Sequence, residues 1–257
     1  MVVFKNTYSS EVSVFMSKKP AKIDSRIWEL DALRGVMVLC VIVVHTLFDL
    51  EAFFDINYPD FYIFIRDNGG ILFILLSGIC ATLGTKTFRR GLVVFGGGML
   101  ITAVTYGMYY FEFAPQGMII SFGILHMLGV CMMIWPVVRL LPNWSVGIIG
   151  VLIVILGFVI AGKTSEVPFS FIIGIPSRYY AAGDYFPLVP YVGWFFIGTF
   201  LGNTVYKKKK SLFPNAPKDF FLIRFFRYCG VYSLYIYLLH QPVVYGIISL
   251  IMYLTVL

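Results

Sequence analysis

The sequence predicts an all-α polytopic membrane protein. Of its 257 residues, 59% are hydrophobic and only 13% are charged, about half the charged share of an ordinary soluble domain. The mean hydropathy is +0.85. A soluble globular enzyme of this size could not bury so much apolar surface, so that class is excluded. The apolar runs are continuous and do not alternate with polar residues, which favours spanning helices over an outer-membrane barrel.

Charge-free runs predict about seven transmembrane helices. A helix needs about 20 apolar residues to cross roughly 30 Å of hydrocarbon. Six runs meet this length, and a shorter one at 35–48 spans only if Arg34 or Asp49 enters the membrane. Residues 167–175 are apolar but too short to cross, so we predict a re-entrant or interfacial segment there. The predicted helices lie at about 32–50, 68–85, 91–111, 120–140, 145–162, 187–206 and 228–255.

The basic residues predict the orientation of these helices. With the N-terminus inside, 17 of the 20 Lys and Arg residues lie on the inner side, and only Arg66, Lys163 and Arg178 lie outside. This asymmetry predicts a cytoplasmic N-terminus and an external C-terminus. Residues 1–25 are then a polar cytoplasmic tail, expected to be mobile. Residues 26–257 form a single transmembrane domain of a multi-pass plasma-membrane protein.

All three histidines fall inside predicted helices. With a rise of 1.5 Å per residue, His45 and His126 lie roughly 8 and 9 Å from the outer face, and His240 lies roughly 18 Å from the inner face. The three therefore share one layer in the outer half of the membrane. Polar groups at such depth are costly and mark functional sites. A structural role, with the ring bonded to a backbone carbonyl, stays equally open for His126 and His240.

One face of the first predicted helix carries four ionisable residues. Arg34 and His45 are eleven residues apart, which places them on the same face about 16–17 Å from each other. Asp49 follows His45 by one turn, where a carboxylate would fix the imidazole tautomer and raise its basicity. Asp31 can pair with Arg34. We predict that His45 is a general base assisted by Asp49. The alternative is that Arg34 only reaches inner headgroups and His45 only bonds a carbonyl.

These motifs resemble two related families. An Arg followed by ten residues and a His on a first membrane helix resembles the signature of acyltransferase family 3. The sequence GluLeuAspAlaLeuArgGly at 29–35, with His45 and Asp49, is more similar to the heparan-α-glucosaminide N-acetyltransferase catalytic-domain family. The resemblance covers about residues 26–245. Further similar stretches lie at 73–79, 122–129, 184–202 and 232–243.

The resemblance implies a membrane acyltransferase that moves an acetyl group from cytoplasmic acetyl-CoA to an amine or hydroxyl of a carbohydrate or amino-sugar acceptor. Such chemistry needs a base and donors for the developing oxyanion. We predict that His45 is the base, that His126 is an oxyanion donor or partner acid, and that His240 lines the site. Anionic CoA needs cations at the inner helix ends, and the outer connection would hold the acceptor. The residues predicted to bind CoA are Arg34, Arg89 and Arg90. The residues predicted to bind the acceptor are Arg178 and Asp184.

A transporter or channel remains the main alternative, because substrate or proton passage would use the same buried His, Arg and Asp residues. The four Cys residues lie within predicted helices without metal-like spacing, so we predict no metal site. The basic run 207–210 directly follows a predicted span. It indicates headgroup contact with the lipid bilayer rather than nucleic-acid binding. The sequence leaves open whether acetylation is on nitrogen or oxygen, and whether the chain forms a homodimer.

Overall fold

A computed structural model describes residues 26–54, 58–218 and 220–256. It confirms the predicted all-α class, and the predicted tail at residues 1–25 lies outside the described residues. The helices of this part of the chain are α2 (Trp28–Phe54), α3 (Asp60–Leu83), α4 (Thr87–Tyr110), α5 (Ile124–Val138), α6 (Asn143–Ile160), α7 (Ser170–Ile173), α8 (Leu188–Val205), α9 (Phe221–Val231) and α10 (Ser233–Val256), with a 3-10 turn, η1 (Gln116–Met118).

Six of the described helices are long and apolar enough to cross a membrane: α2, α3, α4, α6, α8 and α10. The segment predicted at 120–140 is the exception, because its helix, α5, has only 15 residues. The residues before α5 are extended, since two hydroxyls on α4 bind the backbone of Ile120. Thr102 donates to its carbonyl at 2.6 Å, and Thr105 accepts from its N–H at 3.1 Å. The structure therefore supports six of the about seven predicted transmembrane helices by length, and a crossing at α5 stays a prediction.

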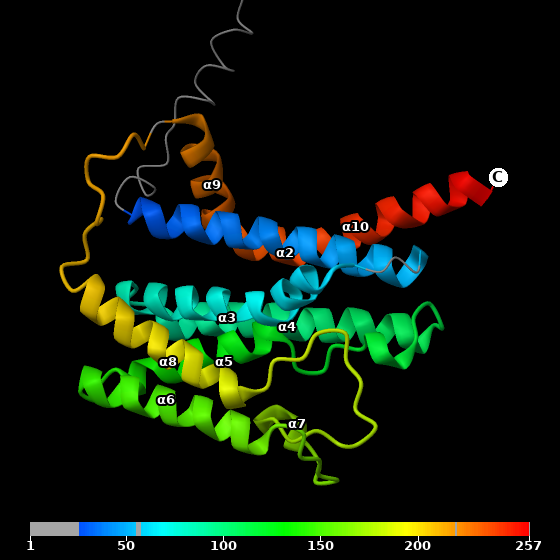
Figure 1. The fold of residues 1–257 in the computed structure, drawn as a ribbon, viewed down its shortest axis with the longest axis horizontal. Coiled ribbons are helices and arrows are strands. Elements are labelled where there is room, and N and C mark those ends of the chain that lie inside the picture. The colour runs from blue at the N-terminus through cyan, green and yellow to red at the C-terminus, as the bar shows by residue number, and fades with distance from the viewer. Residues whose placement is uncertain (1–25, 55–57, 219, 257) are drawn as a thin grey trace, which may run out of the picture.

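The predicted last helix, 228–255, is two helices. They are separated at Tyr232, which has φ −98° and ψ 14°. Figure 1 shows α9 standing across the bundle, whereas α10 runs along it and ends at the side opposite the start of α2. The segment predicted to be interfacial, 167–175, contains the single turn α7 and does not cross.

Glycine pairs set the closest helix contacts. An added Cβ at any of these glycines would meet the backbone of the partner helix, so the helices approach until their backbones touch. Membrane helices gain little from burying apolar surface against one another, and close backbone packing replaces that driving force. The four pairs are Gly35 with Gly230 (α2 and α9), Gly78 with Gly198 (α3 and α8), Gly91 with Gly129 (α4 and α5), and Gly150 with Gly193 (α6 and α8).

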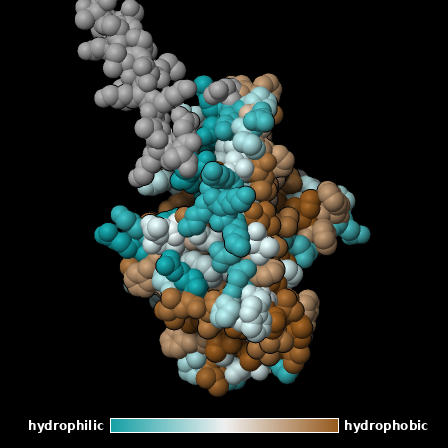
Figure 2. Space-filling view, turned by 90° about the vertical axis from the view of Figure 1, so that its left-hand side faces the viewer, coloured by the Kyte–Doolittle hydropathy of each residue, from teal (hydrophilic) through white to brown (hydrophobic). Residues whose placement is uncertain are grey.

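The helices form two layers. Figure 1 shows α2, α9 and α10 on one side and α3, α4, α5, α6 and α8 on the other. A core that includes Val38, Ile74, Met127 and Phe195 joins the layers. Figure 2 looks onto the end at which α2 begins, where hydrophilic residues gather in the middle of the face and hydrophobic residues dominate below and on the right-hand flank.

Candidate active site

Two of the three histidines singled out from the sequence face each other between α2 and α10, within one layer. The ring centroids of His45 on α2 and His240 on α10 are 5.1 Å apart, with the planes at 57°. The Nδ1 atom of His240 lies 2.6 Å from the carbonyl oxygen of Tyr237, one turn earlier. A carbonyl only accepts, so we assign the proton to Nδ1 and the lone pair to Nε2. That Nε2 is buried and has no hydrogen-bond partner among the described residues, which makes the pair a candidate for chemistry.

Asp49 does not take the partner expected from the sequence. Its buried carboxylate was predicted to bind the ring of His45. Instead it accepts two hydrogen bonds from the Nε2 of Gln241, at 3.1 and 2.9 Å. The reason is the position of α10, which places Gln241 opposite Asp49. The bonds tie α10 to α2 beside the two histidines, so Asp49 acts on their geometry through Gln241.

His126 lies apart from the other two histidines. Its Nδ1 accepts the backbone N–H of Gly123 at 3.2 Å, and its Nε2 lies 3.2 Å from the hydroxyl of Thr102. That hydroxyl donates to a carbonyl, so Nε2–H is the donor to Thr102. The ring stacks on Phe122 and is only 2% exposed. Both nitrogens of His126 are thus engaged, and of the three histidines predicted to share one layer, His45 and His240 are the two whose rings adjoin.

A cavity of about 460 Å³ lies beside the histidine pair. It is bounded by α2, α3, the start of α5, the connection before α8, and α10. His45 lines it directly, and so do five polar side chains from four other segments. These are Arg66, Asp184, Tyr185, Tyr191 and Tyr237, and the apolar lining includes Met37, Cys40, Val41, Val44, Phe48, Ile65 and Phe73.

Asp184 was predicted as an acceptor residue and lies in the wall of this cavity. Its Oδ2 accepts the backbone N–H of Ile124 at 3.1 Å, at the N-terminus of α5, where the helix dipole favours an anion. A side-chain hydrogen bond also joins Asp184 to Tyr237. Burial raises the pKa of Asp184 to about 6, although both hydrogen bonds act in the opposite direction. Tyr237 therefore connects Asp184 to His240, whose Nδ1 binds the Tyr237 carbonyl.

Arg178, the other predicted acceptor residue, is exposed and does not line the cavity. The cation in the cavity wall is Arg66, which lies 3.5 Å from Glu51. Arg66 was predicted to lie in the outer loop, because the helix predicted in this region began at residue 68. The apolar run 61–65 just before it was the available signal that the helix starts earlier. No signal in the sequence identifies Tyr237 as a site residue, because it lies within an apolar run.

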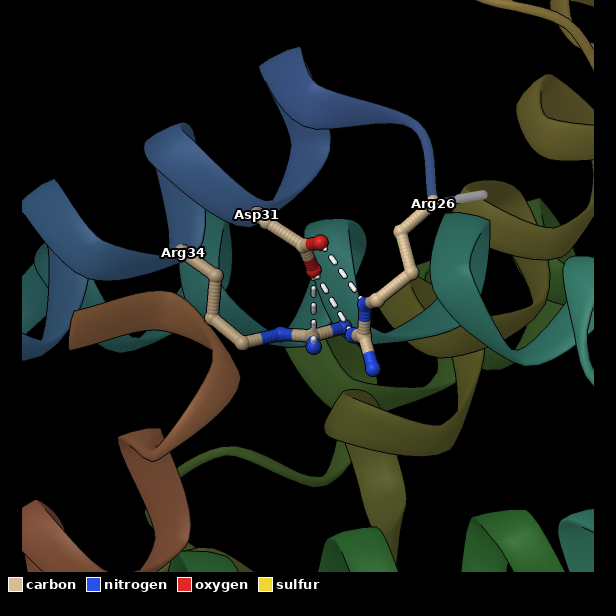
Figure 3. Close-up of polar contacts among 3 residues, drawn as sticks. All are labelled: Arg26, Asp31 and Arg34. Carbon is tan, nitrogen blue, oxygen red and sulfur yellow. Dashed lines mark hydrogen bonds and ion pairs between the residues drawn. The ribbon is translucent and has the colours of Figure 1, made fainter. Parts of the chain in front are cut away.

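A second polar cluster lies at the other end of α2. Arg26 binds Asp31 through two hydrogen bonds of 2.7 Å, one from Nε and one from Nη2. Arg34 Nη1 lies 3.9 Å from the same carboxylate, so the predicted pairing of Asp31 with Arg34 is present but is the longer of the two. Figure 3 shows both guanidinium groups directed at Asp31. One buried carboxylate thus holds two guanidinium groups at the start of α2.

Arg90 adds a third cation to this cluster. The positive charges of Arg34 and Arg26 act on its guanidinium, which lies over Gly84, where a Cβ would come within 2.8 Å of Nη1. Arg89 is exposed. Two of the three arginines predicted to bind CoA therefore lie together. Among the described residues, no group of His, Cys, Asp or Glu side chains is arranged to hold a metal ion.

Comparison with known proteins agrees with the motifs. The family model described as "Heparan-alpha-glucosaminide N-acetyltransferase, catalytic" matches residues 26–242. This range begins at the arginine cluster and ends just after His240, so it includes both ends of the candidate site. No curated protein and no solved structure matches the chain. The match covers most of the sequence, and the chain therefore belongs to the heparan-alpha-glucosaminide N-acetyltransferase catalytic-domain family of membrane acetyltransferases.

Proposed function

We propose that the protein transfers an acetyl group from cytoplasmic acetyl-CoA to an amine or hydroxyl of a sugar-type acceptor in the outer half of the plasma membrane. The observation that carries this proposal is the cavity. It is lined by Met37, one turn beyond Arg34, and it extends past His45 to Asp184 in the connection before α8. A donor anchored at one end of α2 and an acceptor entering from the other would thus meet at His45.

The donor end of the proposal rests on charge and length. Two guanidinium groups pair with one carboxylate near the start of α2, and the charges of this cluster also act on Arg90, which leaves an excess of positive charge for the phosphates of CoA. From Arg34 to His45 the helix rises about 16–17 Å, comparable to an extended pantetheine arm. The apolar side chains of Met37, Val41 and Val44 line the cavity along this stretch and suit the arm and its thioester.

The proposed chemistry is direct transfer. His45 takes the proton from the acceptor while the acceptor's nitrogen or oxygen attacks the thioester carbonyl. The tetrahedral intermediate collapses with cleavage of the C–S bond, and the CoA thiolate leaves and regains a proton from His45. His240 supports this step because its Nε2 is a second proton acceptor beside His45. Asp49 acts as a positioning residue through Gln241.

The roles of the remaining predicted residues follow from their contacts. His126 was predicted to stabilise an oxyanion, but its two nitrogens bind Gly123 and Thr102. We therefore assign it to holding the extended segment before α5. Asp184 and Arg66 in the cavity wall are the proposed acceptor-binding residues.

The test is acetyl transfer by the purified chain in vesicles. His45→Ala should still gain thermal stability from acetyl-CoA, as specific binding requires, yet lose roughly 10²–10⁴-fold in transfer rate. The rate of the unchanged protein should rise with pH as His45 loses its proton, because only the neutral imidazole accepts one. Thr46→Ala, on the next residue, is the matched control and should transfer normally.

Other results would assign the chain differently. Full activity of His45→Ala with an unchanged pH profile would remove His45 from the chemistry. If His126→Ala lost transfer without losing thermal stability, His126 would be catalytic and not structural. Passage of a sugar or of protons through the vesicle membrane without consumption of acetyl-CoA would favour the transporter alternative.

A further inference from the structure

The cavity beside His45 has a side opening between α2 and α3. Three of its lining residues are exposed, namely Cys40, Phe48 and Ile65, the last two by 41% and 37%. Large apolar side chains on the same two helices are exposed next to this opening, such as Val43 (57%) and Leu72 (59%). On membrane-spanning helices such side chains face lipid. The opening therefore faces the hydrocarbon.

The donor path does not account for this opening. Acetyl-CoA anchored near Arg34 would approach His45 along Met37 and Val41. Phe48 lies about one helical turn beyond His45, on the acceptor side, and Ile65 lines the same side from α3. A water-soluble sugar arriving at the end of the bundle would need no apolar opening there.

The lining changes from apolar to polar toward the histidine. The opening presents exposed Phe48 and Ile65, whereas the less exposed His45 and Asp184 line the cavity together with Arg66. A volume of about 460 Å³ lies in the usual range for small-molecule sites. A ligand that matches this gradient has a polar head and an apolar tail.

We propose that the acceptor is a membrane amphiphile. Its sugar-type head would place the reacting amine or hydroxyl at His45, and its hydrocarbon tail would leave the cavity between α2 and α3 into the outer leaflet. This inference rests on the proposed acetyl transfer and names the class of its acceptor. The products are the N- or O-acetylated lipid and free CoA.

Gly69 offers a way to narrow the opening. It lines the cavity, and a Cβ there would meet only Ile65, at 3.9 Å, so a larger side chain has room to enter the groove. Gly96 on α4 is exposed, and a Cβ there would meet nothing within 4 Å. Gly69→Leu and Gly96→Leu therefore add the same side chain inside and outside the opening.

The experiment measures transfer from acetyl-CoA to glucosamine, to glucose and to their alkyl glycosides of increasing chain length in vesicles, each over a range of total acceptor concentrations. We expect KM to fall by up to about fourfold for each methylene that enters the opening, with kcat nearly constant. Gly69→Leu should weaken the dependence of KM on chain length, whereas Gly96→Leu should leave this dependence unchanged. Equal KM values for free sugar and alkyl glycoside would overturn the proposal, as would a series that Gly69→Leu does not alter.

A binding measurement separates failure of this inference from failure of the proposed transfer. An alkyl glycoside with a photoactivatable diazirine in its tail should crosslink to α2 and α3 around Cys40 and Ile65, and unlabelled alkyl glycoside should compete. This result requires no acetyl transfer, so it would support the amphiphile site even if the protein did not transfer acetyl groups. Crosslinks spread over all lipid-facing helices, with no competition, would overturn it.

Discussion

At the scale of single residues, hydrogen-bond partners separate groups that the sequence presents as equivalent. His126 and His240 both lie in apolar helices, yet one has both nitrogens bonded and the other has a buried Nε2 without a partner among the described residues. The sequence identified His45 and His240 individually through their depth. It could not reveal that they adjoin, because that depends on which helices pack together. Nor could it reveal that Gln241 binds Asp49.

The arginine cluster leads to a prediction about donor binding. Arg34→Ala should weaken acetyl-CoA binding by about 1.5–3 kcal/mol, because a charge-assisted contact to phosphate is lost. Arg34→Lys should recover only part of this, since an ammonium cannot replace a planar guanidinium. Titration of the purified protein with acetyl-CoA measures both. The control is Arg89→Ala, on an exposed residue, with a smaller expected loss. If all three variants bound acetyl-CoA as tightly as the unchanged protein, Arg34 would only anchor α2.

The environment of Asp184 leads to a prediction about pH. Burial raises its pKa from 3.8 to about 6, so the protonated form favours the folded state. This contribution is fully present below about pH 4 and is lost as the pH rises through about 6. It amounts to at most about 3 kcal/mol. Asp184→Asn is neutral at every pH, so its thermal stability relative to the unchanged protein should increase between pH 4 and pH 7. Parallel stability curves for the two proteins over this range would contradict the assignment.

At the scale of helices, charge-free runs predicted where helices exist better than where they end. The predicted 145–162 and 187–206 lie within two residues of α6 and α8. The predicted 68–85 began eight residues after the start of α3, because Arg66 was treated as a loop residue although it pairs with Glu51. The break at Tyr232 lies in an uncharged run and left no signal there. Just before the break, the close contact of Gly35 with Gly230 holds α9 against α2.

The glycine contacts lead to a prediction about helix packing. At Gly78 an added Cβ would lie only 3.0 Å from the backbone nitrogen of Thr199, so Gly78→Ala must separate α3 from α8. We expect a loss of about 1–3 kcal/mol in unfolding free energy, as for other overpacked sites. Gly96→Ala, with open space around its Cβ, should be neutral or stabilising. Thermal unfolding in detergent compares the two variants. Equal midpoints would mean that α3 and α8 do not depend on this contact.

At the scale of the whole molecule, the fold places two polar clusters at different depths on α2. The arginine cluster lies at its start, and the histidine pair lies about three turns later, where α10 and the connection before α8 meet it. The sequence predicted both depths, because they depend only on position along one helix. It could not predict the cavity between them, because that is bounded by segments that are distant in sequence. The proposed transfer between a donor and an acceptor on opposite sides therefore requires that the chain cross the membrane as predicted.

The predicted orientation of the chain can be tested at α5, the helix that is too short to span the membrane by itself. α5 has 15 residues and a length of about 22 Å, so it crosses only if the extended residues before it also enter the membrane. Reporters active only outside the cytoplasm would be fused after residues 114, 141 and 256. If the chain crosses at α5, the basic-residue asymmetry predicts activity at 114 and 256 and none at 141. Activity at both 114 and 141 would mean that α5 does not cross. In that case α6, α8 and α10 would be inverted, and the basic run 207–210 would face outward against the positive-inside rule.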